Sequence, residues 1–300
     1  MKRATTKKTT TVKPAKNKKP DDKTPKGGPA KVNALTIDAP KTIARLEQFL
    51  RDFLVETGFD GYIIGLSGGI DSAVSAALAV RAVGAEKVHA YSMPYKTGLH
   101  AVKDARIVAD WLKIDVIELD ITKMIDSYYA DAKSVNPIRA GNKMARERMS
   151  ILFDQAFESR LLVLGTTNRT ELALGYFTWF GESGCSVNVL GQLYKTQVRQ
   201  IARELEAPEF IQEKAPSADF WPGQIDEDEL GLTYDEVDLL LNKIVDEGVT
   251  SRSALIKAGF DEALIQRALA FANRLSFKRK CPKIASLGKP DFPDKIVLKK

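Results

Sequence analysis

The stretch Gly65-Leu66-Ser67-Gly68-Gly69-Ile70-Asp71-Ser72 decides the fold of this 300-residue chain. It follows the apolar run 62–64 and precedes an alanine-rich helical pattern, which predicts a buried strand, a tight glycine turn and a helix N-terminus. Backbone N–H groups at such a turn, together with the positive end of the helix dipole, bind phosphate. The alternative is an ordinary helix cap formed by Asp71 and Ser72, which leaves the paired glycines and the two serines unexplained.

Apolar runs alternate with helical patterns from residue 37 to residue 205. The expected strands are 62–66, 88–93, 116–119 and 161–165, and the expected helices are 37–58, 70–83, 100–112, 142–159 and 194–205. This alternation predicts an α/β fold with a doubly wound, Rossmann-like parallel sheet and a ligand site at the carboxyl ends of the strands. Two extra C-terminal helices are expected, one from the capping pair Thr233 and Glu236 to about Glu247, and one over 262–275.

The N-terminal segment differs in composition from the rest of the chain. Residues 1–31 contain eleven Lys and Arg against two Asp, so a charge of +9 here and +6 for the whole chain leaves −3 elsewhere. We expect residues 1–36 to form a disordered basic tail and residues 37–300 to form one domain. The tail is the only part whose charge favours weak contact with nucleic acid, and a solubilising extension is the alternative.

Other composition signals exclude several classes of protein. No stretch approaches the ~18 consecutive apolar residues of a membrane span, and the N-terminus lacks the apolar core of a secretory signal. Cys185 and Cys281 have no C-x-x-C partner, and the only histidines are His89 and His100, so no zinc site is expected. We expect a protein of the cytoplasm with no membrane partner.

The SGGIDS motif is not the G-x-x-x-x-G-K-[ST] nucleotide loop, because no lysine follows its glycines. It is not the G-x-G-x-x-G loop either, because its glycines have a different spacing. It resembles the pyrophosphate loop of the N-type ATP pyrophosphatases, which cleave ATP between its α and β phosphates. The resemblance implies that residues 65–72 bind ATP and that Asp71 binds Mg²⁺.

Further matches make the chain similar to the ammonia-dependent NAD synthetases over about residues 38–290. They comprise residues 93–95, 141–149, 165–171, 175–178, 194–198, 214–219 and 226–234. The resemblance implies a carbon–nitrogen ligase that activates deamido-NAD with ATP and Mg²⁺, releases pyrophosphate, and lets ammonia displace AMP. It also implies a homodimer with deamido-NAD near the subunit interface. Because no glutaminase domain precedes the loop, free ammonia is the expected nitrogen donor, unless a separate glutaminase subunit supplies it.

The same resemblance assigns the remaining ATP-site residues. Lys195 matches a lysine that contacts ATP phosphate and is expected to be catalytic with Asp71, Glu171 matches a second Mg²⁺ position, and Thr166 and Ser217 match hydroxyl contacts to ATP. The structural alternatives are a solvated first-turn lysine for Lys195, and a helix cap and a first-turn acid for Thr166 and Glu171.

The positions for the acyl substrate depart from the family pattern. Arg146 and Lys278 match residues that contact deamido-NAD, although Arg146 alone could equally be an exposed helix charge. Trp179 replaces a lysine, Ser186 an aspartate and Phe277 a histidine. One interpretation is drift or a misaligned loop, with the same substrate held by neighbours such as Glu182. The other is a divergent paralogue that activates a different carboxylate.

Two further classes of function compete with the ligase. A tRNA-modifying pyrophosphatase uses the same loop, but it brings a sulfur-handling cysteine pair or an RNA-binding domain, which the sequence does not show. The non-enzymatic alternative is an ATP-binding scaffold, and Asp71, Glu171 and Lys195 together speak against it, because a binder has less need of two metal positions.

Overall fold

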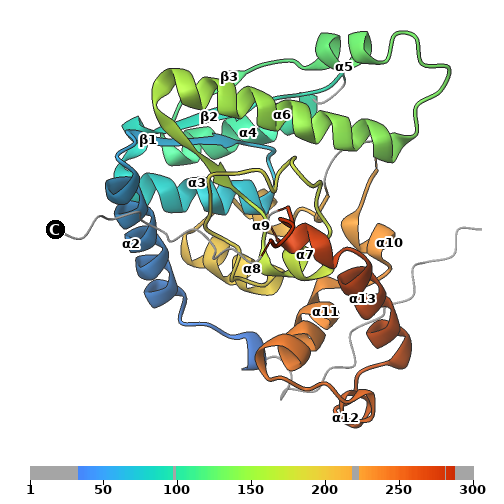
Figure 1. Cartoon of the computed structure of the whole chain (residues 1–300). Helices are drawn as coiled ribbons and strands as arrows, with labels where there is room; N and C mark the ends of the chain where they lie inside the picture. The colour runs from blue at the N-terminus through green and yellow to red at the C-terminus, as the bar shows by residue number, and fades with distance from the viewer. Residues whose placement is uncertain (1–32, 97–98, 218–222, 281, 288–300) are drawn as a thin grey trace, which may run out of the picture.

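Five parallel strands form the centre of the computed structural model, which describes residues 33–96, 99–217, 223–280 and 282–287 (Figure 1). They are β1 (Gly61–Gly65), β2 (Val88–Ser92), β3 (Val116–Glu118), β4 (Leu161–Gly165) and β5 (Val187–Asn188). Their order is β3-β2-β1-β4-β5. The order in which strands are added to the sheet therefore reverses between the neighbours β1 and β4, and the carboxyl ends of these two strands define the ligand crevice of a doubly wound sheet. The predicted α/β class is confirmed.

Successive side chains of the strands point to opposite faces of the sheet, which gives each face its own core. In β1, Tyr62 and Ile64 pack into the core beneath α2 (Ala39–Thr57) and α3 (Ile70–Val83). Ile63 packs into the core beneath α6 (Pro137–Ser159). Because both faces of β1 and β4 are buried, these two strands consist of apolar residues, tyrosine and glycine.

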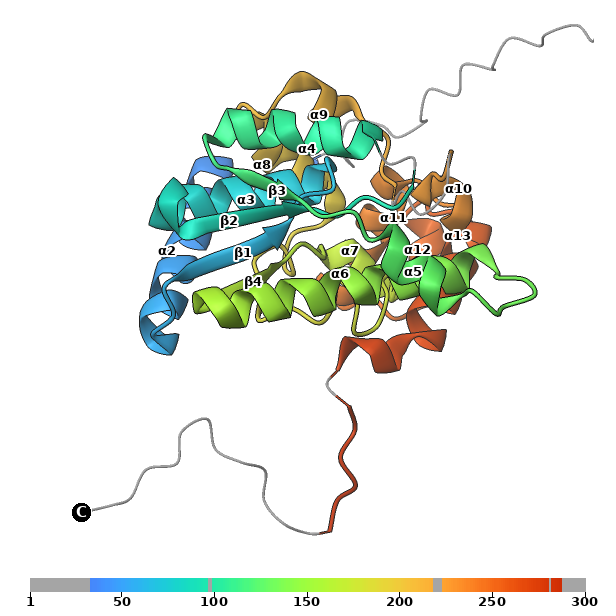
Figure 2. The ribbon, with the colours of Figure 1, turned by 90° about the horizontal axis from the view of Figure 1, so that it is seen from above.

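The helices lie in two layers around the sheet. Figure 2 shows α3, α4 (Leu99–Leu112) and α8 (Lys195–Glu204) on one side of the strands and α6 on the other. The short helices α5 (Thr122–Tyr128) and α9 (Glu209–Glu213) and the 3₁₀ turns η1 (Asn33–Leu35) and η2 (Ala85–Lys87) complete this part. No helix of the described residues is both long enough and apolar enough to cross a membrane.

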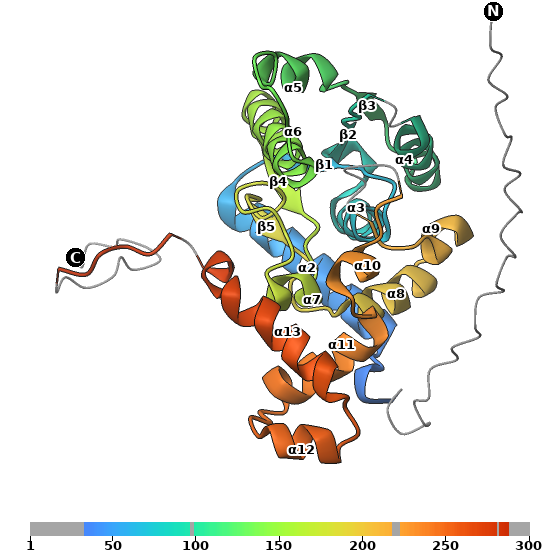
Figure 3. The same cartoon turned by 90° about the vertical axis from the view of Figure 1, so that its right-hand side faces the viewer.

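The C-terminal helices form a third group with a core of their own (Figure 3). They are α10 (Asp226–Leu230), α11 (Tyr234–Leu241), α12 (Arg252–Lys257), α13 (Glu262–Arg274) and the 3₁₀ turn η4 (Ser276–Arg279). Their core includes Leu174 of α7 (Arg169–Leu174), the helix that follows β4. The group is therefore anchored next to the carboxyl edge of the sheet.

Several boundaries differ from the predictions. Helix α6 begins at Pro137 and not at 142, because the Asn136 side chain accepts a hydrogen bond from the Ile138 N–H (2.8 Å) and proline suits the first helical position. The α-helix starting at Tyr234 ends at Leu241, and a π-helical turn (η3, Asn242–Asp246) continues it. Helices α5, α7, α9, α10 and α12 have five to seven residues, too few for a helical period to show in the sequence.

The expected tail lies mostly outside the described residues, which begin at residue 33. Its disorder, and the division of the chain at residue 36, stay predictions.

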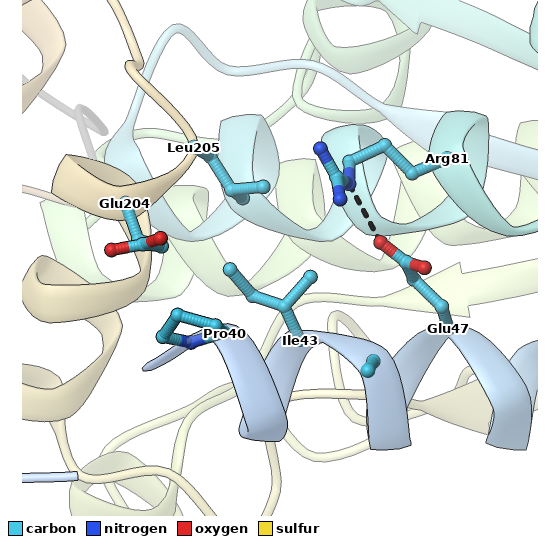
Figure 4. Close-up of a pocket in the computed structure, with 7 residues that line it drawn as sticks. Pro40, Ile43, Glu47, Arg81, Glu204 and Leu205 are labelled. Atoms are coloured by element: carbon cyan, nitrogen blue, oxygen red, sulfur yellow. Dashed lines mark hydrogen bonds and ion pairs between the residues drawn. The ribbon is translucent and has the colours of Figure 1, made fainter. Parts of the chain in front are cut away.

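A cavity of about 160 Å³ opens between α2, α3 and α8 (Figure 4). Glu47 and Arg81 form an ion pair on its wall, with Nε and Oε1 2.6 Å apart. Arg81 lies in the last turn of α3, at the opposite end of that helix from the SGGIDS loop. The cavity is therefore not part of the predicted ATP site.

Candidate active site

The SGGIDS loop turns sharply between β1 and α3. Gly68 has φ +73°, and a Cβ atom there would lie 2.4 Å from Cβ of Asp104 on α4, so only glycine fits. The hydroxyl of Ser72 donates to the Gly69 carbonyl (3.0 Å) and lies 3.1 Å from the Ser67 hydroxyl, which braces the turn from within.

Gly69 is the N-cap of α3, so no cap side chain bonds the first N–H groups of the helix. The alternative that Asp71 or Ser72 caps this helix is wrong. Asp71 instead occupies the first turn, beside N–H groups that suit an anion.

Lys195 joins the two predicted metal positions. Its side chain is 3% exposed, and Nζ forms an ion pair with Asp71 and lies 4.0 Å from Oε1 of Glu171. Asp71 follows β1 and Glu171 follows β4, and because these strands are neighbours the two carboxylates converge at one edge of the sheet. A solvated Lys195 is therefore the wrong interpretation.

The charges of this cluster depend on one another. Burial alone lowers the pKa of Lys195, but the negative charges of Asp71 and Glu171 outweigh it and hold the pKa above its usual value. Burial and the charge of Asp71 raise the pKa of Glu171 well above its usual value, and Lys195 opposes this only in part. Added positive charge between the carboxylates would therefore stabilise their ionised forms.

Asn168 links the two carboxylates and was not among the predicted site residues. Its Nδ2 donates to Oδ1 of Asp71 (3.1 Å), its Oδ1 accepts from the Glu171 N–H (3.0 Å), and its own N–H donates to Oε2 of Glu171 (3.1 Å). The last two bonds form a capping box at the start of α7. The sequence signal was present, since Asn followed three residues later by Glu is the pattern of such a box.

A third acid, Asp226, lies close to the cluster. It is 5% exposed, and the hydroxyls of Tyr176 and Tyr234 donate to its two oxygens (3.2 and 3.4 Å). The Tyr234 ring lies 5.3 Å from Nζ of Lys195. Burial and the nearby acids hold the pKa of Tyr234 well above its usual value, so its phenol stays neutral beside the lysine.

The donor set fits Mg²⁺. Two carboxylates at one edge are what this ion takes from a protein when phosphate and water oxygens complete an octahedron. Among the described residues no group of three or more His, Cys, Asp or Glu side chains forms a closed cage for a metal. Asp71 and Glu171 would hold the ion.

The two predicted hydroxyl contacts to ATP, Thr166 and Ser217, lie on different segments of the chain. Thr166 directly follows β4, and because Asn168 caps α7, the cap interpretation of Thr166 is wrong. Ser217 follows Lys214, whose Nζ bonds Asp104 (2.7 Å) and the Gly68 carbonyl (3.4 Å). The chain that carries Ser217 is therefore tied to the SGGIDS loop.

Four of the five predicted acyl-substrate residues lie close together. The two cationic ones, Arg146 and Lys278, donate hydrogen bonds to backbone carbonyl groups. Arg146 Nε donates to the carbonyl of Trp179 (3.0 Å), and Trp179 packs edge to face on Phe277 with ring centroids 5.2 Å apart. Lys278 Nζ donates to the carbonyls of Gly175 (2.9 Å) and Phe177 (2.6 Å). Burial lowers the pKa of Lys278. Both cations therefore brace the 175–179 segment.

Ser186 and Glu182 have structural partners. The Ser186 hydroxyl accepts from the N–H of Val163 in β4 (3.1 Å), so the structure joins Ser186 to the sheet and not to the aromatic pair. Oε1 of Glu182 accepts from the Thr178 N–H (2.6 Å), and burial raises the pKa of this carboxyl.

A buried carboxylate, Asp238, lies behind the cluster. It is 0% exposed and accepts hydrogen bonds from the Thr170 hydroxyl (2.5 Å) and the Thr196 N–H (2.8 Å). Burial raises its pKa from 3.8 to about 6, although these hydrogen bonds oppose the shift.

Loss of the proton from the Asp238 carboxyl group is expected to lower the free energy of unfolding as the pH rises. The folded state binds its proton more tightly than the unfolded state, so this contribution is fully present below about pH 4 and is lost as the pH passes about 6. A shift of this size corresponds to about 3 kcal/mol. Urea unfolding between pH 4 and 7 should show a steeper decline in the wild type than in Asp238→Asn, because the buried carboxyls of Glu171 and Glu182, whose pKa values are also raised, contribute equally to both proteins. Parallel curves for the two proteins would contradict the expectation.

Comparisons with known proteins agree with this geometry. A model of the NAD synthase family matches residues 42–282. The NH(3)-dependent NAD(+) synthetase of Fusobacterium nucleatum is 42% identical over 257 residues, which is 85% of this chain and 99% of that protein. The corresponding protein of Chlorobaculum tepidum is 44% identical over 245 residues, 81% of this chain and 88% of the other.

Solved structures show the same relationship. The NMN synthetase of Francisella tularensis is 32% identical with a TM-score of 0.73, and the NH3-dependent NAD synthetase of Campylobacter jejuni is 27% identical with a TM-score of 0.71. Each alignment covers 84% of this chain and 100% of the other. Because the family model matches residues 42–282 and relatives at least 42% identical match more than 80% of the chain, the chain belongs to the NAD synthase family.

Proposed function

We propose that the protein amidates deamido-NAD to NAD with ATP, Mg²⁺ and ammonia. The observation that carries this proposal is the buried contact of Lys195 with Asp71, beside Glu171, at the N-terminus of α3. A cation and two carboxylates thus meet beside the helix N-terminus that we propose binds phosphate, which supports the proposal. Family membership and the names of the F. nucleatum and C. tepidum relatives support the substrate and the nitrogen donor.

The residues suit attack of a carboxylate on the α-phosphate of ATP. The bond from the α-phosphorus to the bridging oxygen breaks, and pyrophosphate leaves with that electron pair. The loop N–H groups and the ammonium of Lys195 stabilise the negative charge on the phosphate oxygens. Mg²⁺, when bound by Asp71 and Glu171, supplies further positive charge. Ammonia then attacks the acyl carbon of the adenylate, AMP leaves, and a proton is released.

Two assays test this proposal. Deamido-NAD should support exchange of labelled pyrophosphate into ATP, and addition of ammonium should convert deamido-NAD to NAD with one AMP released per amide. ATP binding without carboxylate-dependent exchange would overturn the proposal and favour the ATP-binding scaffold. Membership in the NAD synthase family does not support the tRNA-modifying alternative.

A second candidate function is amidation of a related acid, and one observation favours it. The family pattern predicts cations on the acyl substrate, but positions 179 and 277 are aromatic and Lys278 bonds carbonyl groups. An acid with fewer phosphates needs fewer cations. The name of the F. tularensis relative, NMN synthetase, suggests nicotinate mononucleotide as the acid to compare with deamido-NAD.

Restoring a cation at position 179 is expected to shift preference toward deamido-NAD. In Trp179→Lys, one added ammonium can pair with the second phosphate of deamido-NAD, which nicotinate mononucleotide lacks. The ratio of kcat/KM for the two acids should change about tenfold. Phe180→Lys adds the same charge at a neighbouring side chain that is 52% exposed and serves as the matched control. Equal ratios in the two variants would contradict a role of position 179 in substrate choice.

We also propose a homodimer. Exposed aromatic side chains one helical turn apart on α6, Phe153 and Phe157, support it, because they are 43% and 88% exposed in the single chain. Light scattering across protein concentration tests it, and Phe157→Glu should favour the monomer. The location in the cytoplasm stays a prediction.

A further inference from the structure

Buried hydrogen bonds connect the C-terminal helices to the cluster formed by Asp71, Glu171 and Lys195. Asp238 lies on α11 among apolar side chains, with Val237, Leu240 and Leu241 of the same helix in the C-terminal core. A carboxylate in such surroundings is costly unless hydrogen bonds satisfy its oxygens. Asp238 has these bonds, and both reach out of its own helix to the site.

The two partners of Asp238 are sequence neighbours of catalytic positions. Thr170 donates its hydroxyl to one oxygen, and Thr196 donates its N–H to the other. Thr170 precedes Glu171 in the first turn of α7, and Thr196 follows Lys195 in the first turn of α8. One side chain therefore bonds the N-termini of both helices that carry the metal and phosphate residues.

The hydroxyl of Thr170 completes the connection. It accepts a hydrogen bond from the backbone N–H of Lys195 (3.0 Å) while it donates to Asp238. Thr170 is 0% exposed and Lys195 is 2% exposed, so water does not compete for these bonds. The first two N–H groups of α8 thus have fixed acceptors, and a negative charge at a helix N-terminus is favourable.

We propose that Asp238 is a positioning residue that, through Thr170 and Thr196, holds α7 and α8 in register so that Lys195 stays between Asp71 and Glu171. This inference rests on the proposed function of Lys195 as a phosphate contact. Asp238 bonds Thr170 and Thr196, and it would act on Lys195 and Glu171 only through them. The C-terminal helices thereby contribute to ATP binding from outside the sheet.

Two isosteric variants remove the connection at different points. Asp238→Asn removes the charge, and Thr170→Val removes the hydroxyl that joins Asp238 to the Lys195 N–H. Each is expected to weaken binding of Mg²⁺·ATP by about tenfold, as loss of an outer-shell partner does for a metal site. Thr170→Ser keeps the hydroxyl and should retain wild-type affinity. Glu236→Gln is the matched control, because Glu236 is an exposed acid of α11 that bonds Thr233 in the cap of the same helix.

Calorimetric titration with Mg²⁺·ATP, at a temperature where circular dichroism shows every variant folded, measures the effect. The two residues act through one hydrogen-bonded unit. The affinity of the double variant for Mg²⁺·ATP should therefore lie within about twofold of the affinity of either single variant. Additive losses would overturn the proposal, as would affinities within twofold of wild type in both single variants. Equal losses in Thr170→Ser and Thr170→Val would also overturn it.

This readout is independent of the acid that the enzyme activates. If the wild type binds Mg²⁺·ATP but does not amidate deamido-NAD, the proposed function fails while the affinity ratios still decide the role of Asp238.

Discussion

Lys195→Met is expected to reduce carboxylate-dependent ATP–pyrophosphate exchange by about 10³-fold. Loss of one preorganised group that stabilises transition-state charge costs about 10² to 10³ in kcat, and Lys195 also separates two carboxylates. Methionine has a similar length, so the change removes the charge and leaves the volume nearly unchanged. Without the ammonium, Asp71 and Glu171 repel each other more strongly, and the pKa of Glu171 should rise further.

The assay for Lys195 is kcat for exchange at saturating ATP and Mg²⁺. Lys243→Met provides the control, because Lys243 is a partly exposed lysine that pairs with Glu247 on the C-terminal helices. A loss of less than tenfold in Lys195→Met would contradict the role of Lys195. Equal losses in the two lysine variants would point to a general effect of charge.

Glu171→Gln is expected to raise the Mg²⁺ concentration for half-maximal activity by about 10- to 100-fold. The variant keeps an oxygen that can accept from the Asn168 N–H, so the capping box at the start of α7 survives. It removes the charge, and a neutral amide is a weaker Mg²⁺ ligand than a carboxylate. The thermal unfolding temperature in the absence of Mg²⁺ should therefore change little.

Titration of activity with Mg²⁺ at fixed free ATP measures this effect. Glu236→Gln offers a matched control on α11, where Glu236 bonds Thr233 in the helix cap. An unchanged Mg²⁺ requirement in Glu171→Gln would exclude Glu171 as a metal ligand. A large drop in unfolding temperature would show that Glu171 acts mainly through the cap.

Much of the framework could be predicted from the sequence. The strand, loop and helix around SGGIDS follow from neighbouring residues, and α3 and β4 have the predicted bounds. The alternation of patterns predicted the parallel sheet, and therefore the edge where Asp71 and Glu171 meet. Asn168 was overlooked although its capping box is a local signal.

Other features of the site could not be predicted in this way. The partners of Asp238 lie 68 and 42 residues away, on α7 and α8, and no periodicity in α11 indicates them. The backbone carbonyl partners of Arg146 and Lys278 could not be predicted either, because they depend on the path of the 175–179 segment and not on either residue type.

Local signals in the sequence were enough to predict a glycine turn between a strand and a helix of a parallel sheet, because strand, turn and helix signals act between residues a few positions apart. The burial of Lys195 against Asp71, 124 residues away, depends on long-range packing. That contact requires β1 and β4 to be neighbours and α8 to begin against Thr170 and Asp238. The physical reason is that a buried ion pair depends on which segments exclude water around it, and packing of the whole chain sets this.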